Sequence, residues 1–114
     1  MNDDREFSAL RNQYEQFPYP ERDPSEELQR LQLTSLDQLP VLNHVCFGGR
    51  ESFADARLLV AGCGTGDAAV YLGEQLKNSG ARIVAIDLSE TSLHIARRRA
   101  EMRELASGRT VPRD

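Results

Sequence analysis

The sequence is poor in the features that mark several classes of protein. It has two cysteines and no tryptophan. Cys46 and Cys63 form no C-x-x-C pattern and lack a His/Cys cluster, so we expect neither a zinc site nor a disulfide framework. No apolar run approaches the roughly 20 residues of a membrane-spanning helix, and the N-terminus is acidic where a secretory signal would be basic. These absences favour a cytoplasmic protein with free thiols, no metal and no membrane partner.

An excess of basic residues is missing as well. The net charge of the 114-residue chain is −4, to which residues 1–56 contribute −6 and residues 57–114 contribute +2. Because an acidic half would repel a phosphate backbone, we expect no generic nucleic-acid surface. Hydrophobic content of 39% and charged content of 28% are typical of a globular protein.

Residues 1–56 are predicted to form a helical N-terminal leader or cap. A helix is expected over residues 6–16, and the prolines of Phe17-Pro18-Tyr19-Pro20 should break it. Residues 25–47 are expected to be helical in two pieces, the second beginning near Ser35 and ending at Gly48-Gly49.

The pattern changes at Arg57, where short apolar runs begin. Residues 57–61 and 82–86 are typical of strands that are buried on both faces, as in a parallel sheet. Two such strands joined by a helix form a right-handed βαβ unit. We therefore predict an α/β fold, a Rossmann-like doubly wound parallel sheet that is apparently truncated, with a helical N-terminal segment.

Helices are expected after each of these strands. Asp67 is the predicted N-cap of the first helix, and Ser89 or Glu90 should open a longer second helix. The inner face of that second helix is predicted to carry Leu93, Ala96 and Ala100.

A glycine-rich turn, Gly62-Cys63-Gly64-Thr65-Gly66, follows the first strand directly. Residues without a Cβ permit positive φ angles and a close approach between the backbone and a ligand. Asp87 follows the second strand, 21 residues after Gly66. Since neighbouring parallel strands end at the same edge, Asp87 should lie beside the turn, where a carboxylate accepts hydrogen bonds from ribose hydroxyls.

The spacing of the glycines bears on the ligand. Dinucleotide sites use G-x-G-x-x-G, whereas this chain has G-x-G-x-G with Asp67 in place of the last glycine. A carboxylate at that position would place a negative charge where the pyrophosphate of a dinucleotide binds. Both features disfavour NAD or FAD and favour a ligand without phosphates, such as S-adenosylmethionine (SAM).

The segments LLVAGCGTG at 58–66 and VAIDLSETSLHIARRRAE at 84–101 resemble successive motifs of the class I SAM-dependent methyltransferases. YEQFPYP at 14–20 is similar to the leader of some of these enzymes. The resemblance implies SAM as the cofactor, with close backbone approach at the glycines and ribose binding by the acid. The cofactor-binding residues that it implies are Gly62, Cys63, Gly64, Thr65, Gly66, Asp87 and Leu88.

One position departs from the family pattern. The family often has an acid two residues before the first glycine, where it helps to hold the amino-acid end of SAM, and this chain has Val60. Binding of the amino-acid end of SAM is therefore expected to be weaker. Tyr14 and Tyr19 either cover the site as a lid or pack against the domain.

A basic run at 97–99, with Arg103, allows two interpretations. It forms either a patch for a nucleic acid or substrate, or a solvated helix face paired with Glu101 and Glu104. Consecutive helical residues spread around the helix, so the solvated face is favoured.

A complete domain of this family is considerably longer than this chain. The third strand and the motif that faces the methyl acceptor are expected to be absent, and the tail SGRTVPRD is not expected to replace them. The predicted organisation is a leader over 1–56 and the first half of a SAM-binding Rossmann-like domain over 57–114. The free edge of the first strand is expected to favour self-association.

The predicted function is therefore the SAM-binding, N-terminal portion of a methyltransferase that is inactive by itself. The methyl acceptor is unknown and no residue is assigned a catalytic role. Two alternatives stay open: a non-catalytic interaction module that kept the SAM fold, and a fragment of an NAD-dependent oxidoreductase.

Overall fold

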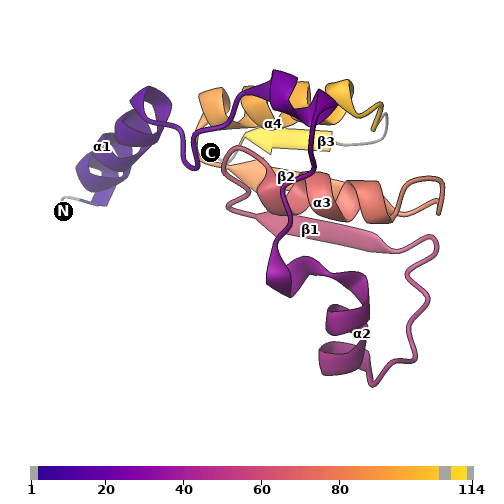
Figure 1. Ribbon diagram of the computed structural model, residues 1–114. Coiled ribbons are helices and arrows are strands. Elements are labelled where there is room, and N and C mark those ends of the chain that lie inside the picture. The colour runs from indigo at the N-terminus through magenta and orange to yellow at the C-terminus, as the bar shows by residue number, and fades with distance from the viewer. Residues whose placement is uncertain (1–2, 106–108, 113–114) are drawn as a thin grey trace.

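The computed structural model describes residues 3–105 and 109–112, which form an α/β fold (Figure 1). Its elements, in chain order, are α1 (Asp3–Gln16), the 3-10 helices η1 (Pro24–Leu28) and η2 (Ser35–Asp37), α2 (Leu39–Phe47), β1 (Arg57–Ala61), α3 (Asp67–Gln75), β2 (Arg82–Asp87), α4 (Glu90–Met102) and β3 (Arg109–Pro112). No helix in this part of the chain is both long enough and apolar enough to cross a bilayer.

The strands form one parallel sheet in the order β1-β2-β3. β1 and β2 occupy the predicted residues, with β2 one residue longer. β3 corrects the expectation that the tail adds no strand: it pairs with β2, with Asp87 opposite Pro112. A run of four residues that follows a glycine and ends in a proline is too short to give a recognisable strand pattern, so only its pairing with β2 reveals it.

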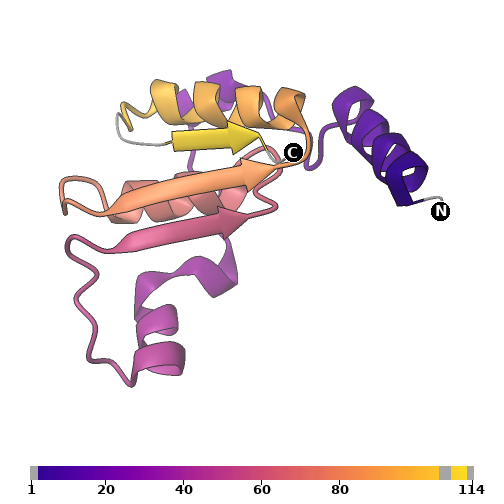
Figure 2. The same cartoon turned by 180° about the vertical axis from the view of Figure 1, so that it is seen from behind.

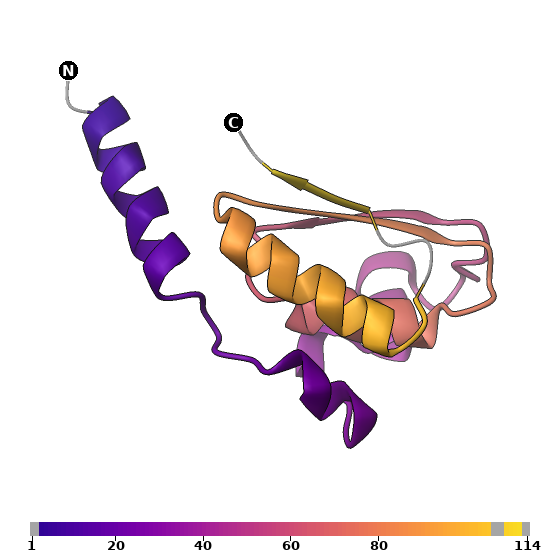
Figure 3. The same cartoon turned by 90° about the horizontal axis from the view of Figure 1, so that it is seen from above.

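Within the described residues, the sheet is covered on one face. Figure 3 shows α3 and α4 on one side of the sheet and no described segment on the other. Val60 of β1 and its register partner Ala85 face the helices and pack with Cys63 and Leu93. Because strand side chains alternate, Leu59 points to the uncovered face, where it is 64% exposed. β1 is therefore buried on one face, although its apolar run is typical of a strand that is buried on both.

The helices on the sheet begin close to their predicted positions. Ser89 caps α4, its side chain accepting a hydrogen bond from the Ser92 backbone N–H at 3.0 Å. Leu93 and Ala96 on this helix are buried as predicted. α3 differs, since its N-cap is Gly66 and Asp67 is its first helical residue. The Asp67 carboxylate is used elsewhere, as described below.

The leader contains the predicted helices, with one difference in kind. α1 starts three residues earlier than expected, and the piece expected from residue 25 is a short 3-10 helix, η1, preceded by Asp23 as its N-cap. η1 lies against α4, whereas α2 extends beyond the free edge of β1 (Figures 1 and 2). Gly48, in a left-handed conformation, ends α2.

Candidate functional site

The glycine turn and Asp87 meet at the carboxyl ends of β1 and β2. The backbone N–H of Gly64 donates to Oδ2 of Asp87 at 2.7 Å, and the N–H of Cys63 donates to the carbonyl of Ile86 at 3.0 Å. The other carboxylate oxygen, Oδ1, accepts from the N–H of Ser89 at 3.0 Å. The acid is thereby fixed beside the turn, and both elements come from strands whose parallel register requires their tips to adjoin.

The three glycines of the turn have different neighbours, although all adopt positive φ angles. A Cβ on Gly64 would lie 2.5 Å from the carbonyl oxygen of Tyr19, and one on Gly66 would lie 2.8 Å from Cβ of Ala96. At Gly62, no atom of the described residues lies within 4 Å of the corresponding position. Gly62 is thus the glycine over which a ligand has room, while the other two admit the leader and α4.

The remaining predicted site residues differ in accessibility. Thr65 is fully buried, and its hydroxyl donates to the carbonyl of Pro20 in the leader. Cys63 is buried under the turn, and Leu88 is half-buried after β2. The side chain of Tyr19 is exposed, so the leader covers the turn through its backbone. The side chain of Tyr14 lies outside the described part of the structure.

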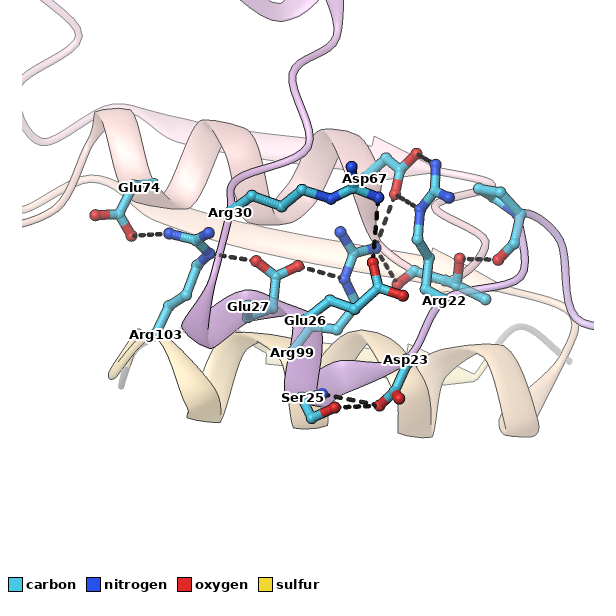
Figure 4. A network of polar contacts seen from close by, with 12 residues as sticks. Arg22, Asp23, Ser25, Glu26, Glu27, Arg30, Asp67, Glu74, Arg99 and Arg103 are labelled. Carbon is cyan, nitrogen blue, oxygen red and sulfur yellow. Dashed lines mark hydrogen bonds and ion pairs between the residues drawn. The ribbon is translucent and has the colours of Figure 1, made fainter.

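A network of buried charges joins the leader to the turn and to α4 (Figure 4). Arg22 of the leader donates to both carboxylate oxygens of Asp67, at 2.8 and 2.7 Å. Arg99 of α4 donates to the same carboxylate at 2.8 Å and to the carbonyl of Thr65 at 2.9 Å. These contacts hold the glycine turn between the leader and α4.

The same network continues along α4 through Glu27 of η1. Glu27 accepts from Nε of Arg99 at 2.7 Å and from Nε of Arg103. Arg103 also lies 3.8 Å from the carboxylate of Glu74 on α3. The side chains of Glu27 and Arg99 are 3% and 1% exposed, so each of these charges depends on its partners.

This network corrects the expectation that the basic run on α4 is a solvated face. The expectation is right for Arg98, which pairs with Glu101 at 3.1 Å on the surface. It is wrong for Arg99 and Arg103. The partner of both is Glu27, more than seventy residues away in the sequence. The sequence carries no clear signal of this pairing, because acids in the first turn, such as Glu26 and Glu27, are ordinary at a helix N-terminus.

The electrostatics of the site follow from these contacts. Hydrogen bonds from Arg22, and then from Arg99, lower the pKa of Asp67 below its ordinary value. Burial, followed by the charge of Asp87, raises the pKa of Cys63 to about 12. The Cys63 thiol is therefore protonated at neutral pH and is not a nucleophile. Val60 faces the helix-covered side of the sheet and takes no part in the polar site.

Comparisons with known proteins identify a domain and a relative. Residues 58–112 match a family model described as a methyltransferase domain. The chain is 31% identical to an uncharacterized phycocyanin operon protein W from Pseudanabaena tenuis, over 91% of this chain and 95% of that protein.

Several solved structures share the fold. A SAM-dependent methyltransferase from Aquifex aeolicus matches with a TM-score of 0.51 at 18% identity, over 82% of this chain and 48% of its own. Coclaurine N-methyltransferase, solved with N-methylheliamine and S-adenosylhomocysteine (SAH), matches with a TM-score of 0.53 at 18% identity, over 96% and 36%. The [4+2]-cyclase SpnF matches with a TM-score of 0.53 at 24% identity, over 85% and 33%.

The chain spans less than half the length of each of these solved structures. It nevertheless has their α/β fold. Residues 58–112 match the methyltransferase-domain model, and the chain is 31% identical to a relative of similar length. Residues 58–112 therefore belong to the methyltransferase-domain family, and the chain as a whole is related to the phycocyanin operon protein W.

Proposed function

We propose that this chain binds SAM at the glycine turn and Asp87, as the SAM-binding portion of a methyltransferase. The observation that carries the proposal is the 2.7 Å hydrogen bond between the Gly64 N–H and the Asp87 carboxylate. It joins the two features that an adenosyl group requires, a turn free of side chains and a carboxylate at the neighbouring strand tip.

In this proposal the site residues have separate tasks. Gly62 leaves room for the ligand. Each carboxylate oxygen of Asp87 accepts a backbone hydrogen bond and can accept a second, so Asp87 keeps acceptor capacity for the ribose hydroxyls. Gly64, Thr65 and Gly66 hold the turn against the leader and α4. Cys63 and Leu88 line it. When bound, SAM would supply a methyl group activated by its sulfonium, and the acceptor is undetermined.

The two alternative functions remain distinct from this proposal. SpnF is named a cyclase and has the same fold, so the fold does not by itself specify methyl transfer. A non-catalytic module would keep the fold without the transfer step. An NAD site is disfavoured by the glycine spacing, although the charge of Asp67 is no longer an argument because Arg22 and Arg99 balance it.

Calorimetric titration with SAM, SAH and NAD tests the proposal. We expect SAM and SAH to bind and NAD to give no heat. Asp87→Asn should weaken SAM binding about tenfold to a hundredfold, because hydrogen bonds to a charged group contribute roughly 1.5–3 kcal/mol.

The matched control for this titration is Glu101→Gln, which neutralises an acid in the exposed ion pair with Arg98 and should leave SAM affinity unchanged. Binding of NAD alone would favour the oxidoreductase fragment, and no binding of any of the three would favour the interaction module. Self-association through the free edge of β1 is a separate proposal, because it rests on the strand and not on the turn.

A further inference from the structure

The first turn of α4 receives a hydrogen-bond partner from the leader. Glu15, in the last turn of α1, accepts from the backbone N–H of Thr91 at 3.3 Å and from the Thr91 hydroxyl at 2.6 Å. Figures 1 and 3 show the carboxyl-terminal end of α1 beside the amino-terminal end of α4. The first backbone N–H groups of a helix have no partner within the helix, so a side chain from another element can satisfy one of them. Glu15 therefore caps α4 from outside the helix.

The residue that precedes this turn also fixes Asp87. The backbone N–H of Ser89 donates to Oδ1 of Asp87 at 3.0 Å, while the Ser89 hydroxyl accepts from the N–H of Ser92. Ser89 and Ser92 are 0% and 1% exposed, so these bonds are shielded from water. The position of the Asp87 carboxylate therefore depends on the position of the first turn of α4.

The charge of Glu15 suits its place. A carboxylate at the amino-terminal end of a helix is stabilised by the helix dipole. Hydrogen bonding, chiefly from the Thr91 side chain, lowers the pKa of Glu15 below its ordinary value. Glu15 is therefore ionised at neutral pH, and hydrogen bonds to an ionised acceptor are stronger than those between neutral groups.

The leader fixes the other half of the site as well. The carbonyl of Pro20 accepts from the hydroxyl of Thr65, and Arg22 binds the carboxylate of Asp67. Residues 15–22 thus contact the glycine turn on one side and the start of α4 on the other. The hydrogen bond between Gly64 and Asp87 lies between these two attachments.

We propose that Glu15 is a positioning residue of the SAM site: by fixing the first turn of α4, it sets the place of the Asp87 carboxylate. This inference rests on the proposed function of the glycine turn and Asp87. Glu15 acts through Thr91 and Ser89 and does not itself touch the ligand. The glycine motif gives no indication of this role, because Glu15 lies 76 residues before Thr91.

A second contact between the same helices supplies the matched control. Arg11 of α1 forms a 3.7 Å ion pair with Glu90 of α4, and both side chains are largely exposed. Arg11→Gln removes this ion pair and leaves the contact of Glu15 with Thr91 intact. A role of Glu15 in attaching α1 alone would give the two substitutions similar effects.

Nuclear magnetic resonance of the ligand-free chain tests the positioning. The carboxyl carbon of Asp87 and the amide proton of Ser89 both report the hydrogen bond between these residues. Glu15→Ala should shift both resonances, Glu15→Gln should shift them less because it keeps one acceptor oxygen, and Arg11→Gln should shift neither. Unchanged resonances in Glu15→Ala, or equal shifts in Arg11→Gln, would overturn the proposal.

Calorimetric titration with SAM tests the consequence for binding. Glu15→Ala should weaken SAM binding about tenfold, because the carboxylate for the ribose is then displaced. Thr91→Val should weaken it less, and should add nothing to the effect of Glu15→Ala because both act through one contact. Unchanged affinity in Glu15→Ala, or additive effects of the two substitutions, would contradict the role of Glu15.

The two experiments separate this inference from the proposed function. An unaltered chain that binds no SAM would refute the proposed function. The resonances of Asp87 and Ser89 are measured without ligand, so they would still decide whether Glu15 positions the Asp87 carboxylate.

Discussion

At the scale of single residues, Asp67 shows how a motif position can acquire another role. The glycine motif alone suggests a helix cap at this residue, but its carboxylate binds two arginines, one from the leader and one from α4. Local pattern could not reveal this, because Arg22 and Arg99 lie 45 and 32 residues away in the sequence.

The ion pairs of Asp67 predict a pH dependence of stability. Its folded-state pKa is lowered, chiefly by Arg22, so its contribution is fully present above the unfolded value of about 3.9 and is lost as the pH falls through the folded value. The free energy of unfolding, measured with urea, should therefore decline as the pH falls below about 4. Asp67→Asn should be less stable at neutral pH and should show a smaller decline, and an unchanged slope would contradict the assignment.

At the scale of elements, the short helix η1 is attached to α4 by buried charge. Glu27 on η1 accepts from Arg99 of α4 and from Arg103, the C-cap of α4, so a five-residue helix is fixed without a large apolar face. The sequence predicted that a helical piece exists here and could not predict its attachment. The elements β1, α3, β2 and α4 were predictable because apolar periodicity, a glycine turn and caps all indicate the same elements.

Neighbouring glutamates provide a matched test of this attachment. Glu27→Ala leaves Arg99 and Arg103 buried without their shared partner and should cost about 3–5 kcal/mol of unfolding free energy. Glu26→Ala removes only an exposed pair with Arg30 and should change the unfolding free energy by less than about 1 kcal/mol. Chemical denaturation measures both. Equal effects of the two substitutions would mean that the buried network is not what holds η1.

At the scale of the whole molecule, the chain consists of a one-sided sheet, two helices on it, and a leader that crosses the strand tips. The meeting of the glycine turn with Asp87 was predictable, because parallel strands bring their ends together. The open edge and open face of β1 followed from the expected lack of further strands and not from the strand itself, since an apolar strand gives the same pattern whether one or both faces are covered. β3 escaped prediction because four residues carry too little periodicity.

Stability should also vary across the molecule. Glu15 of α1 accepts hydrogen bonds from the backbone N–H and the hydroxyl of Thr91 on α4, and Arg11 forms a 3.7 Å ion pair with Glu90. The apolar side chains of Phe7 and Leu10 on α1 are exposed. Few buried contacts imply a low free energy of local opening. Hydrogen exchange followed by mass spectrometry should show α1 exchanging well before β2. Equal protection of the two segments would refute this ranking.

The contact of the Tyr19 carbonyl with Gly64 affects how the glycine motif is interpreted in related sequences. Any side chain at Gly64 would push the chain that crosses over it out of place, whether or not a small molecule ever enters. Selection would thus keep Gly64 of the glycine turn even in a related protein that no longer binds a cofactor. A glycine retained at position 64 indicates that two backbone segments cross there. Of these two glycines, Gly62 is the one whose retention would indicate ligand binding.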